Sequence, residues 1–267
     1  MPERVWDFDD FGSWRSMVWD MTGDILNEDV REAFLKSPPR FIVSDELGWL
    51  DDIVLAATDR QVNTQHLMIE KLTERFDAVR CCHATNTADV GTYYERGILP
   101  LDLERANQAV RAVYLDGSFP ELSPEEVERA IAAADPEQRV GKAYFEANEW
   151  SLVHKCGHYL LNGSEYVASI ARNLSGPGRR DYRRILRERG KPTMFLCDVP
   201  LGWLRMTIVE AAGTVLENMF KELLEGPDFE PDRYRGFGFS IPWALPPERI
   251  VGHYHLANVR DPHARDR

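Results

Sequence analysis

The chain has 267 residues, of which 43% are hydrophobic and 28% are charged, and its formal net charge is -12. This composition is typical of a globular protein with a sizeable core, and the negative charge opposes general affinity for nucleic acid, which requires clustered positive charge. No apolar run approaches the roughly 20 residues that cross a bilayer. The N-terminus is acidic rather than signal-like, so the sequence predicts a cytoplasmic protein without membrane contact.

Residues 1–75 are predicted to form a helical N-terminal region. Apolar residues recur at helical spacing between Trp14 and Met21 and again up to Phe34, where Ser37-Pro38-Pro39 interrupts the pattern. Two further helices are predicted over residues 47–57 and 62–76. This region offers apolar faces for packing and no evident chemistry.

From residue 76 onward, short strand patterns alternate with helices. A strand from Ala78 is expected to end at His83 in a polar turn, and a helix from Asp89 to end at Gly97. Ser123-Pro124 begins another helix as N-cap and first helical residue. Strands are predicted over residues 141–146, 193–199 and 249–256, and helices over 149–161, 164–174 and 203–224. Apolar residues alternate with glycines over residues 237–241. The order of elements predicts an α+β fold.

Three segments resemble the ADP-ribosyltransferase fold, in the His-Tyr-Glu branch that includes diphtheria toxin and the poly(ADP-ribose) polymerases. They are Cys82-His83-Ala84-Thr85 with Gly97-Ile98-Leu99 after it, Gly141-Lys142-Ala143-Tyr144-Phe145, and the run from Phe195 to Gly202. The resemblance implies an ADP-ribosyltransferase-like mixed split-sheet domain over residues 76–267, which binds NAD.

The resemblance also implies roles for single residues. His83, with Thr85 beside it, is expected to bind the ribose of NAD, and Tyr144 to stack on the nicotinamide ring with Tyr159 as a second wall. The late strand that carries the family's glutamate has no carboxylate over residues 234–239. Glu165 is its proposed substitute, so the expected catalytic residues are His83, Tyr144 and Glu165.

These expectations describe an ADP-ribosyltransferase that cleaves the nicotinamide–ribose bond of NAD and transfers ADP-ribose to a protein, nucleic-acid or small-molecule acceptor. A bacterial toxin or defence effector is the setting that fold analogy suggests. Two alternatives stay open: an NAD glycohydrolase, in which water replaces the acceptor, and a non-catalytic binding protein that keeps the fold. The missing late-strand glutamate favours the second alternative.

Each site residue also has a structural interpretation. His83 and Tyr144 fit ordinary strand positions, Tyr159 fits a core position, and Glu165 fits a helix-terminal or ion-pairing role. An arginine-rich segment over residues 179–189 is either a phosphate-binding face or a solvated one.

No metal is expected. Zinc is the competing hypothesis, because His154 and His158 lie four residues apart and the adjacent Cys81-Cys82 offers thiolate ligands. Two features oppose it: Cys156 points away from that histidine pair on a regular helix, and the chain has no Cys-x-x-Cys pair.

Overall fold

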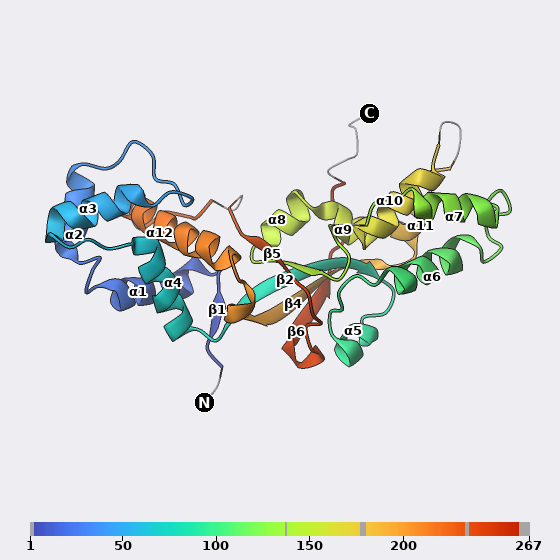
Figure 1. The fold of residues 1–267 in the computed structure, drawn as a ribbon, viewed down its shortest axis with the longest axis horizontal. Coiled ribbons are helices and arrows are strands. Elements are labelled where there is room, and N and C mark those ends of the chain that lie inside the picture. Colours follow the sequence, from blue (N-terminus) through green and yellow to red (C-terminus); the bar gives the residue numbers. More distant parts are fainter. Residues whose placement is uncertain (1–2, 137, 177–179, 233–234, 262–267) are drawn as a thin grey trace. The chain divides into compact units, whose positions relative to one another are not determined.

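The computed structural model describes residues 3–136, 138–176, 180–232 and 235–261. The chain forms two compact units, and both are discontinuous in sequence (Figure 1). The first unit comprises residues 1–81, 146–148 and 198–239, and the second comprises residues 82–145, 149–197 and 240–267. The mixed α+β class predicted from the sequence is confirmed.

The first unit is helical apart from one short strand pairing. Its elements are β1 (Val5–Asp7), α1 (Phe11–Thr22), α2 (Glu28–Lys36), α3 (Gly48–Thr58), α4 (Thr64–Arg75), the 3-10 turn η1 (Leu201–Trp203) and α12 (Thr207–Glu225). β1 pairs in parallel with the start of β2 (Ala78–Thr87), where Trp6 lies opposite Val79. The helices expected within residues 1–75 are therefore present, with β1 before them.

The core of this unit surrounds the middle of α12 and the ring of Trp6. Ten consecutive residues of α12, from Ala211 to Phe220, are buried. The helix includes Gly213, and the backbone of Ser44 packs against this position so closely that a Cβ atom would come within 2.0 Å of the Ser44 carbonyl oxygen. Trp6 is fully buried and packs against the rings of Phe76 and Phe237.

The second unit combines strands of the sheet with a group of helices. Its remaining elements are α5 (Gly91–Arg96), α6 (Leu103–Tyr114), α7 (Pro124–Ala132), β3 (Ala143–Glu146), α8 (Glu149–His154), α9 (Gly157–Asn162), α10 (Glu165–Leu174), α11 (Arg183–Glu188), β4 (Lys191–Pro200), β5 (Gly238–Ile241), η2 (Pro247–Arg249) and β6 (Ile250–His255). The strand order is β5-β3-β2-β4-β6, and β4 pairs with β6 in antiparallel register, with Thr193 opposite His255.

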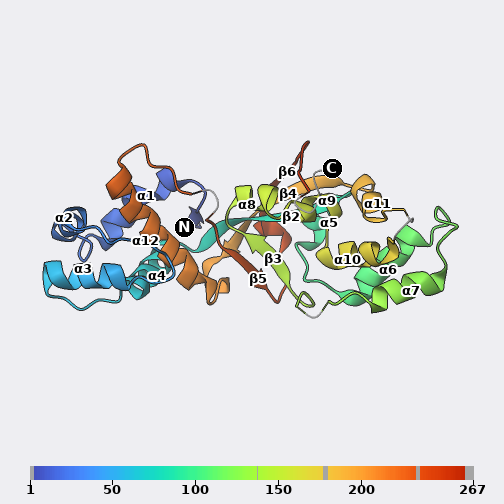
Figure 2. The same ribbon diagram turned by 90° about the horizontal axis from the view of Figure 1, so that it is seen from above.

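Helices cover both faces of these strands. In Figure 1, α8 and α9 lie over one face and α5 lies over the other. Figure 2 shows α6, α7 and α10 side by side beyond the sheet. Their apolar faces meet in a separate core around Tyr114, Ile170 and Tyr182.

Two local predictions are confirmed. Ser123 and Glu126 form a full capping box at the start of α7, with Pro124 as its first residue. Gly97 follows α5 with a φ of 77°, which glycine adopts without strain.

Two other predictions are wrong. The strand from Ala78 does not end at His83 but continues to Thr87, so the expected polar turn is the end of β2. The helix expected over residues 149–161 is interrupted at Lys155-Cys156 and forms α8 and α9.

Candidate functional site

His83 occupies the interior of β2, the strand beside β3 in the sheet. Its Nδ1 lies 2.9 Å from the carbonyl oxygen of Tyr144. A carbonyl only accepts hydrogen bonds, so Nδ1 is the donor, and the neutral ring presents the lone pair of Nε2. Burial lowers the pKa of His83 and outweighs the opposing effect of the Tyr144 carbonyl. The imidazole is therefore neutral near pH 7.

The surroundings of His83 are aromatic. Its ring centroid lies 5.7 Å from that of Phe145 and 6.4 Å from that of Tyr93 on α5. Tyr93 stacks on Phe195 with 4.4 Å between centroids, and its hydroxyl donates a 3.4 Å hydrogen bond to Thr85 Oγ1. His83 and Thr85 therefore share the face of β2 beneath Tyr93, as residues two apart on a strand must.

Tyr144 presents its side chain to the other face. Successive strand residues point to opposite sides, and Phe145 is the residue whose ring meets His83. The Tyr144 ring is 40% exposed, and its hydroxyl donates a 2.8 Å hydrogen bond to the carbonyl of Gln138. The hydrogen bond from His83 reaches the backbone carbonyl of Tyr144 and not its side chain.

Glu165 is the first residue of α10 and is held by two side chains. Arg139 Nε donates a 2.8 Å hydrogen bond to Glu165 Oε2, Arg139 Nη2 donates to the same oxygen, and so does the hydroxyl of Tyr159, at 2.8 Å. Burial alone would raise the pKa of Glu165, but the hydrogen bonds from Tyr159 and Arg139 outweigh it, and the pKa is lowered. The carboxylate is ionised at neutral pH.

Tyr159 lies on the same side as this carboxylate. It packs on α9 against the cluster that contains Cys82 and Ala84, the residues on either side of His83. Burial and the charge of Glu165 raise the pKa of Tyr159 well above its usual range. Its hydroxyl is therefore a fixed donor to Glu165.

The expected site residues do not form one cleft. Arg139 and Tyr159 both donate to Glu165, and the Tyr144 hydroxyl bonds to the carbonyl of Gln138, the residue before Arg139; we call these four side chains, Arg139, Tyr144, Tyr159 and Glu165, the Glu165 cluster. His83 and Thr85 lie on the opposite face of β2 from Tyr159. This separation arises because successive side chains of a strand point to opposite faces of the sheet. The spacing of the motifs in the sequence does not show on which face each side chain lies.

Arg139 is the member of the cluster that the sequence did not single out. It lies in the connection between α7 and β3, two residues before Gly141, and is one of many arginines in the chain. The sequence motifs did not identify Arg139, because its partner Glu165 lies 26 residues further along the chain.

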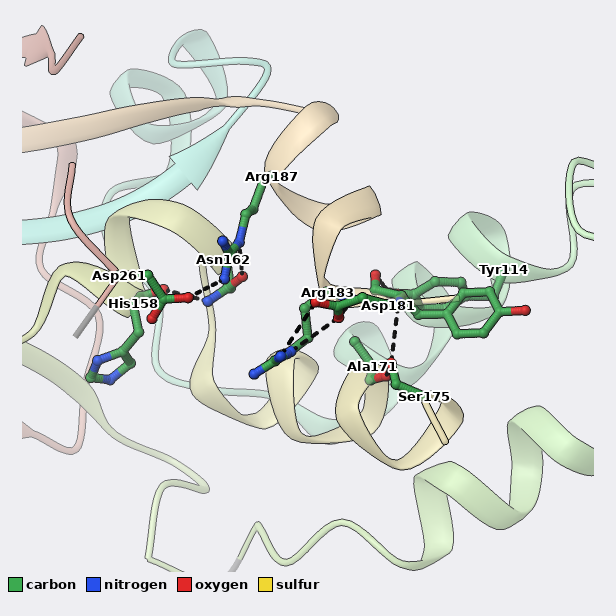
Figure 3. A network of polar contacts seen from close by, with 10 residues as sticks. Tyr114, His158, Asn162, Ala171, Ser175, Asp181, Arg183, Arg187 and Asp261 are labelled. Atoms are coloured by element: carbon green, nitrogen blue, oxygen red, sulfur yellow. Dashed lines mark hydrogen bonds and ion pairs between the residues drawn. The ribbon is translucent and has the colours of Figure 1, made fainter. Parts of the chain in front are cut away.

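The arginine-rich segment is engaged with carboxylates. Arg183 pairs with Asp181, Arg184 with Glu188, Arg187 with Asp261 and Arg189 with Asp116. Arg187 also donates a 3.1 Å hydrogen bond to Asn162 at the end of α9, and Figure 3 shows it between Asn162 and Asp261. These pairs favour the charge-balanced interpretation over a phosphate-binding face.

The zinc hypothesis gains no support within the described residues. No group of three or more His, Cys, Asp or Glu side chains there could hold a metal ion. His154 instead stacks on Trp150 at 4.2 Å between centroids and bonds to its carbonyl through Nδ1. Cys81, Cys82, Cys156 and Cys197 take part in no disulfide bond.

No family model, curated protein or solved structure matches the chain. Over the described residues, none of the helices combines the length and the apolar character that crossing a membrane demands.

Proposed function

We propose that the chain is an NAD-consuming ADP-ribosyltransferase whose reaction takes place at the Glu165 cluster. The observation that supports this proposal is an ionised carboxylate fixed by Arg139 and Tyr159, with the partly exposed Tyr144 bonded to the residue before Arg139. The substrate is NAD, and the acceptor of ADP-ribose is a protein, a nucleic acid or a small molecule.

Cleavage of NAD requires a negative charge close to the anomeric carbon of the nicotinamide ribose. Cleavage of the nicotinamide–ribose bond passes through a state in which positive charge develops on the anomeric carbon. A carboxylate that is already oriented stabilises that charge without reorganising during the reaction. Glu165 performs this role in the proposal, while Tyr144 and Tyr159 bracket the nicotinamide ring.

The role of His83 in this proposal differs from the ribose binding that the sequence resemblance implied. Its Nδ1 donates to the backbone of Tyr144 from the opposite face of the strand. We therefore assign His83 as a positioning residue, which fixes the part of β3 that carries Tyr144, rather than as a direct ribose ligand.

Release of nicotinamide from NAD by the purified chain tests the proposal. We expect Glu165→Gln to reduce the rate by about 100-fold, the usual effect of removing one electrostatic group from an active site. The matched control is Glu128→Gln, which removes a carboxylate that is also paired with an arginine, Arg111, at the exposed surface. Absence of release by the wild type, with protein, nucleic-acid and small-molecule acceptors supplied, would contradict the proposal.

The products distinguish transfer from hydrolysis. A transferase attaches the ADP-ribose group to the acceptor, whereas a glycohydrolase releases free ADP-ribose at the same rate with or without an acceptor. Mass spectrometry of acceptor and supernatant after one incubation measures both.

A non-catalytic binding protein is the second candidate. The observations in its favour are that β5, Gly238-Phe239-Ser240-Ile241, carries no carboxylate and that Arg139 offsets the charge of Glu165. In that case NAD binds with saturable heat in titration calorimetry and is recovered intact.

A further inference from the structure

Two exposed histidines lie side by side on β6, the last strand in the order of the sheet. His253 and His255 are two residues apart, so their side chains share one face of the strand. Strand positions two apart are separated by about 6.6 Å. The two ring centroids are only 5.5 Å apart, so the rings incline toward each other. The proposed NAD reaction uses neither of them.

The tautomer of His255 follows from its contact with Thr193, the residue opposite it on β4. The Thr193 hydroxyl has a single proton, which it donates to the carbonyl oxygen of Lys191 at 2.8 Å. In the 3.0 Å contact with His255 Nδ1, the hydroxyl oxygen is therefore the acceptor and Nδ1 carries the proton. The lone pair of the neutral ring then lies on Nε2.

His253 is also held through its Nδ1 atom. This atom lies 2.8 Å from the hydroxyl oxygen of Tyr94 on α5, and the His253 ring centroid lies 5.8 Å from that of Phe195. A hydroxyl oxygen accepts from Nδ1–H, which leaves a lone pair on Nε2 of this ring as well. Over the part of the chain that the structure describes, nothing bonds to Nε2 of either histidine.

A ring that is fixed through Nδ1 and presents Nε2 is typical of a metal-binding histidine. Such histidines donate their other ring N–H to an oxygen atom, which fixes the tautomer and the orientation of the ring. A zinc ion bound to both Nε2 atoms would lie about 2.1 Å from each nitrogen and roughly 3.2 Å from each ring centre. Ring centres 5.5 Å apart then correspond to an angle of about 120° at the ion. This angle is closer to the tetrahedral arrangement of zinc than to the roughly 90° between neighbouring ligands of square-planar copper or nickel.

The protein supplies two of the four ligands that zinc requires. Among the described residues no third His, Cys, Asp or Glu side chain joins the pair in a metal-binding group. Water completes the coordination, so the ion exchanges with the solvent and does not hold the fold together.

We infer that His253 and His255 bind one Zn²⁺ ion through their Nε2 atoms, while Tyr94 and Thr193 orient the two rings from Nδ1. All four residues belong to the second unit. The site stands independently of the NAD reaction, and its ligand class follows from the paired imidazoles and their fixed tautomers.

Titration calorimetry of the full chain with zinc chloride tests the inference. We expect saturable binding of one zinc ion per chain and no binding of magnesium, which prefers oxygen ligands and keeps its waters. Nitrogen NMR of the zinc-bound chain should show the metal on Nε2 and the proton on Nδ1 in both His253 and His255. Undetectable zinc binding, or zinc-induced changes confined to other histidines, would overturn the inference.

Variants locate the site. His253→Ala and His255→Ala each leave a single imidazole and should weaken zinc binding by about 100-fold, because two linked ligands bind far more tightly than one. Tyr94→Phe removes only the hydroxyl that orients His253 and should weaken zinc binding by about tenfold. The control is His154→Ala, which removes an exposed histidine that sequence spacing suggested as a zinc ligand, and it should leave the affinity unchanged. Wild-type affinity in His253→Ala and His255→Ala, or an equal loss in His154→Ala, would overturn the site.

Discussion

Arg139 Nε donates a 2.8 Å hydrogen bond to Glu165 Oε2 and joins a loop before β3 to the first residue of α10. This pair gives the proposed active site its fixed carboxylate. It also sets the ionisation of that carboxylate, because the hydrogen bonds from Tyr159 and Arg139 lower the pKa of Glu165 against the effect of burial.

Removal of Arg139 should therefore change the pH dependence of nicotinamide release. In Arg139→Gln the pKa of Glu165 rises, so the carboxylate loses its charge at a higher pH. We expect the acid limb of the rate profile to move to higher pH, with a lower maximal rate. Arg139→Lys, which keeps a positive charge, should recover part of the shift. An unchanged acid limb would show that Glu165 does not control it.

His83 should titrate below its ordinary pKa of 6.5, because burial opposes protonation of the ring. Nitrogen NMR of the imidazole should show the proton on Nδ1 at neutral pH. Since the folded-state pKa is lower than that of the unfolded chain, the stability that this residue contributes is present above pH 6.5 and declines as pH falls below it. A titration midpoint above 6.5 would contradict the assignment.

The role of His83 as a positioning residue has its own test. His83→Asn keeps a donor that can reach the Tyr144 carbonyl, whereas His83→Ala removes it. We expect His83→Ala to reduce nicotinamide release about fivefold and His83→Asn to retain most of the activity, because the lost hydrogen bond contributes about 1 kcal/mol. Equal losses in both variants would indicate that the imidazole itself touches the substrate.

Gly213→Ala should destabilise the protein although alanine favours helices. A Cβ atom there would lie 2.0 Å from the Ser44 carbonyl oxygen, so the backbone must move. We expect the free energy of unfolding in urea to fall by about 1–3 kcal/mol. Gly12→Ala in α1 is the control, since its Cβ atom would meet nothing closer than 3.6 Å and should stabilise by roughly 0.5–1 kcal/mol.

Asp77 should contribute to acid stability. The guanidinium and backbone N–H of Arg4 lower the pKa of this carboxyl from 3.8 to about 2. The contribution is complete above pH 3.8 and is lost as pH falls toward 2. Between pH 3.8 and about 2, the free energy of unfolding of Asp77→Asn should therefore fall less than that of the wild type. The control is Asp20→Asn, which changes a carboxylate on the exposed side of α1. Parallel curves for Asp77→Asn and the wild type would contradict the prediction.

The sequence alone determined the elements whose signals are local. The capping box at Ser123, the glycine end of α5 at Gly97 and the apolar strand over residues 193–199 depend on neighbours in the chain, and each is present. The mixed α+β class follows from the order of such elements. Local side-chain and backbone chemistry suffices for these predictions.

The tertiary structure decided what the site consists of. Continuation of β2 past His83 and the pairing of Arg139 with Glu165 depend on contacts between distant residues. The face of the sheet on which each side chain lies depends on register, and a shift of one residue would exchange His83 with Ala84. For that reason the motifs were visible in the sequence, whereas the separation of His83 from the Glu165 cluster required the fold.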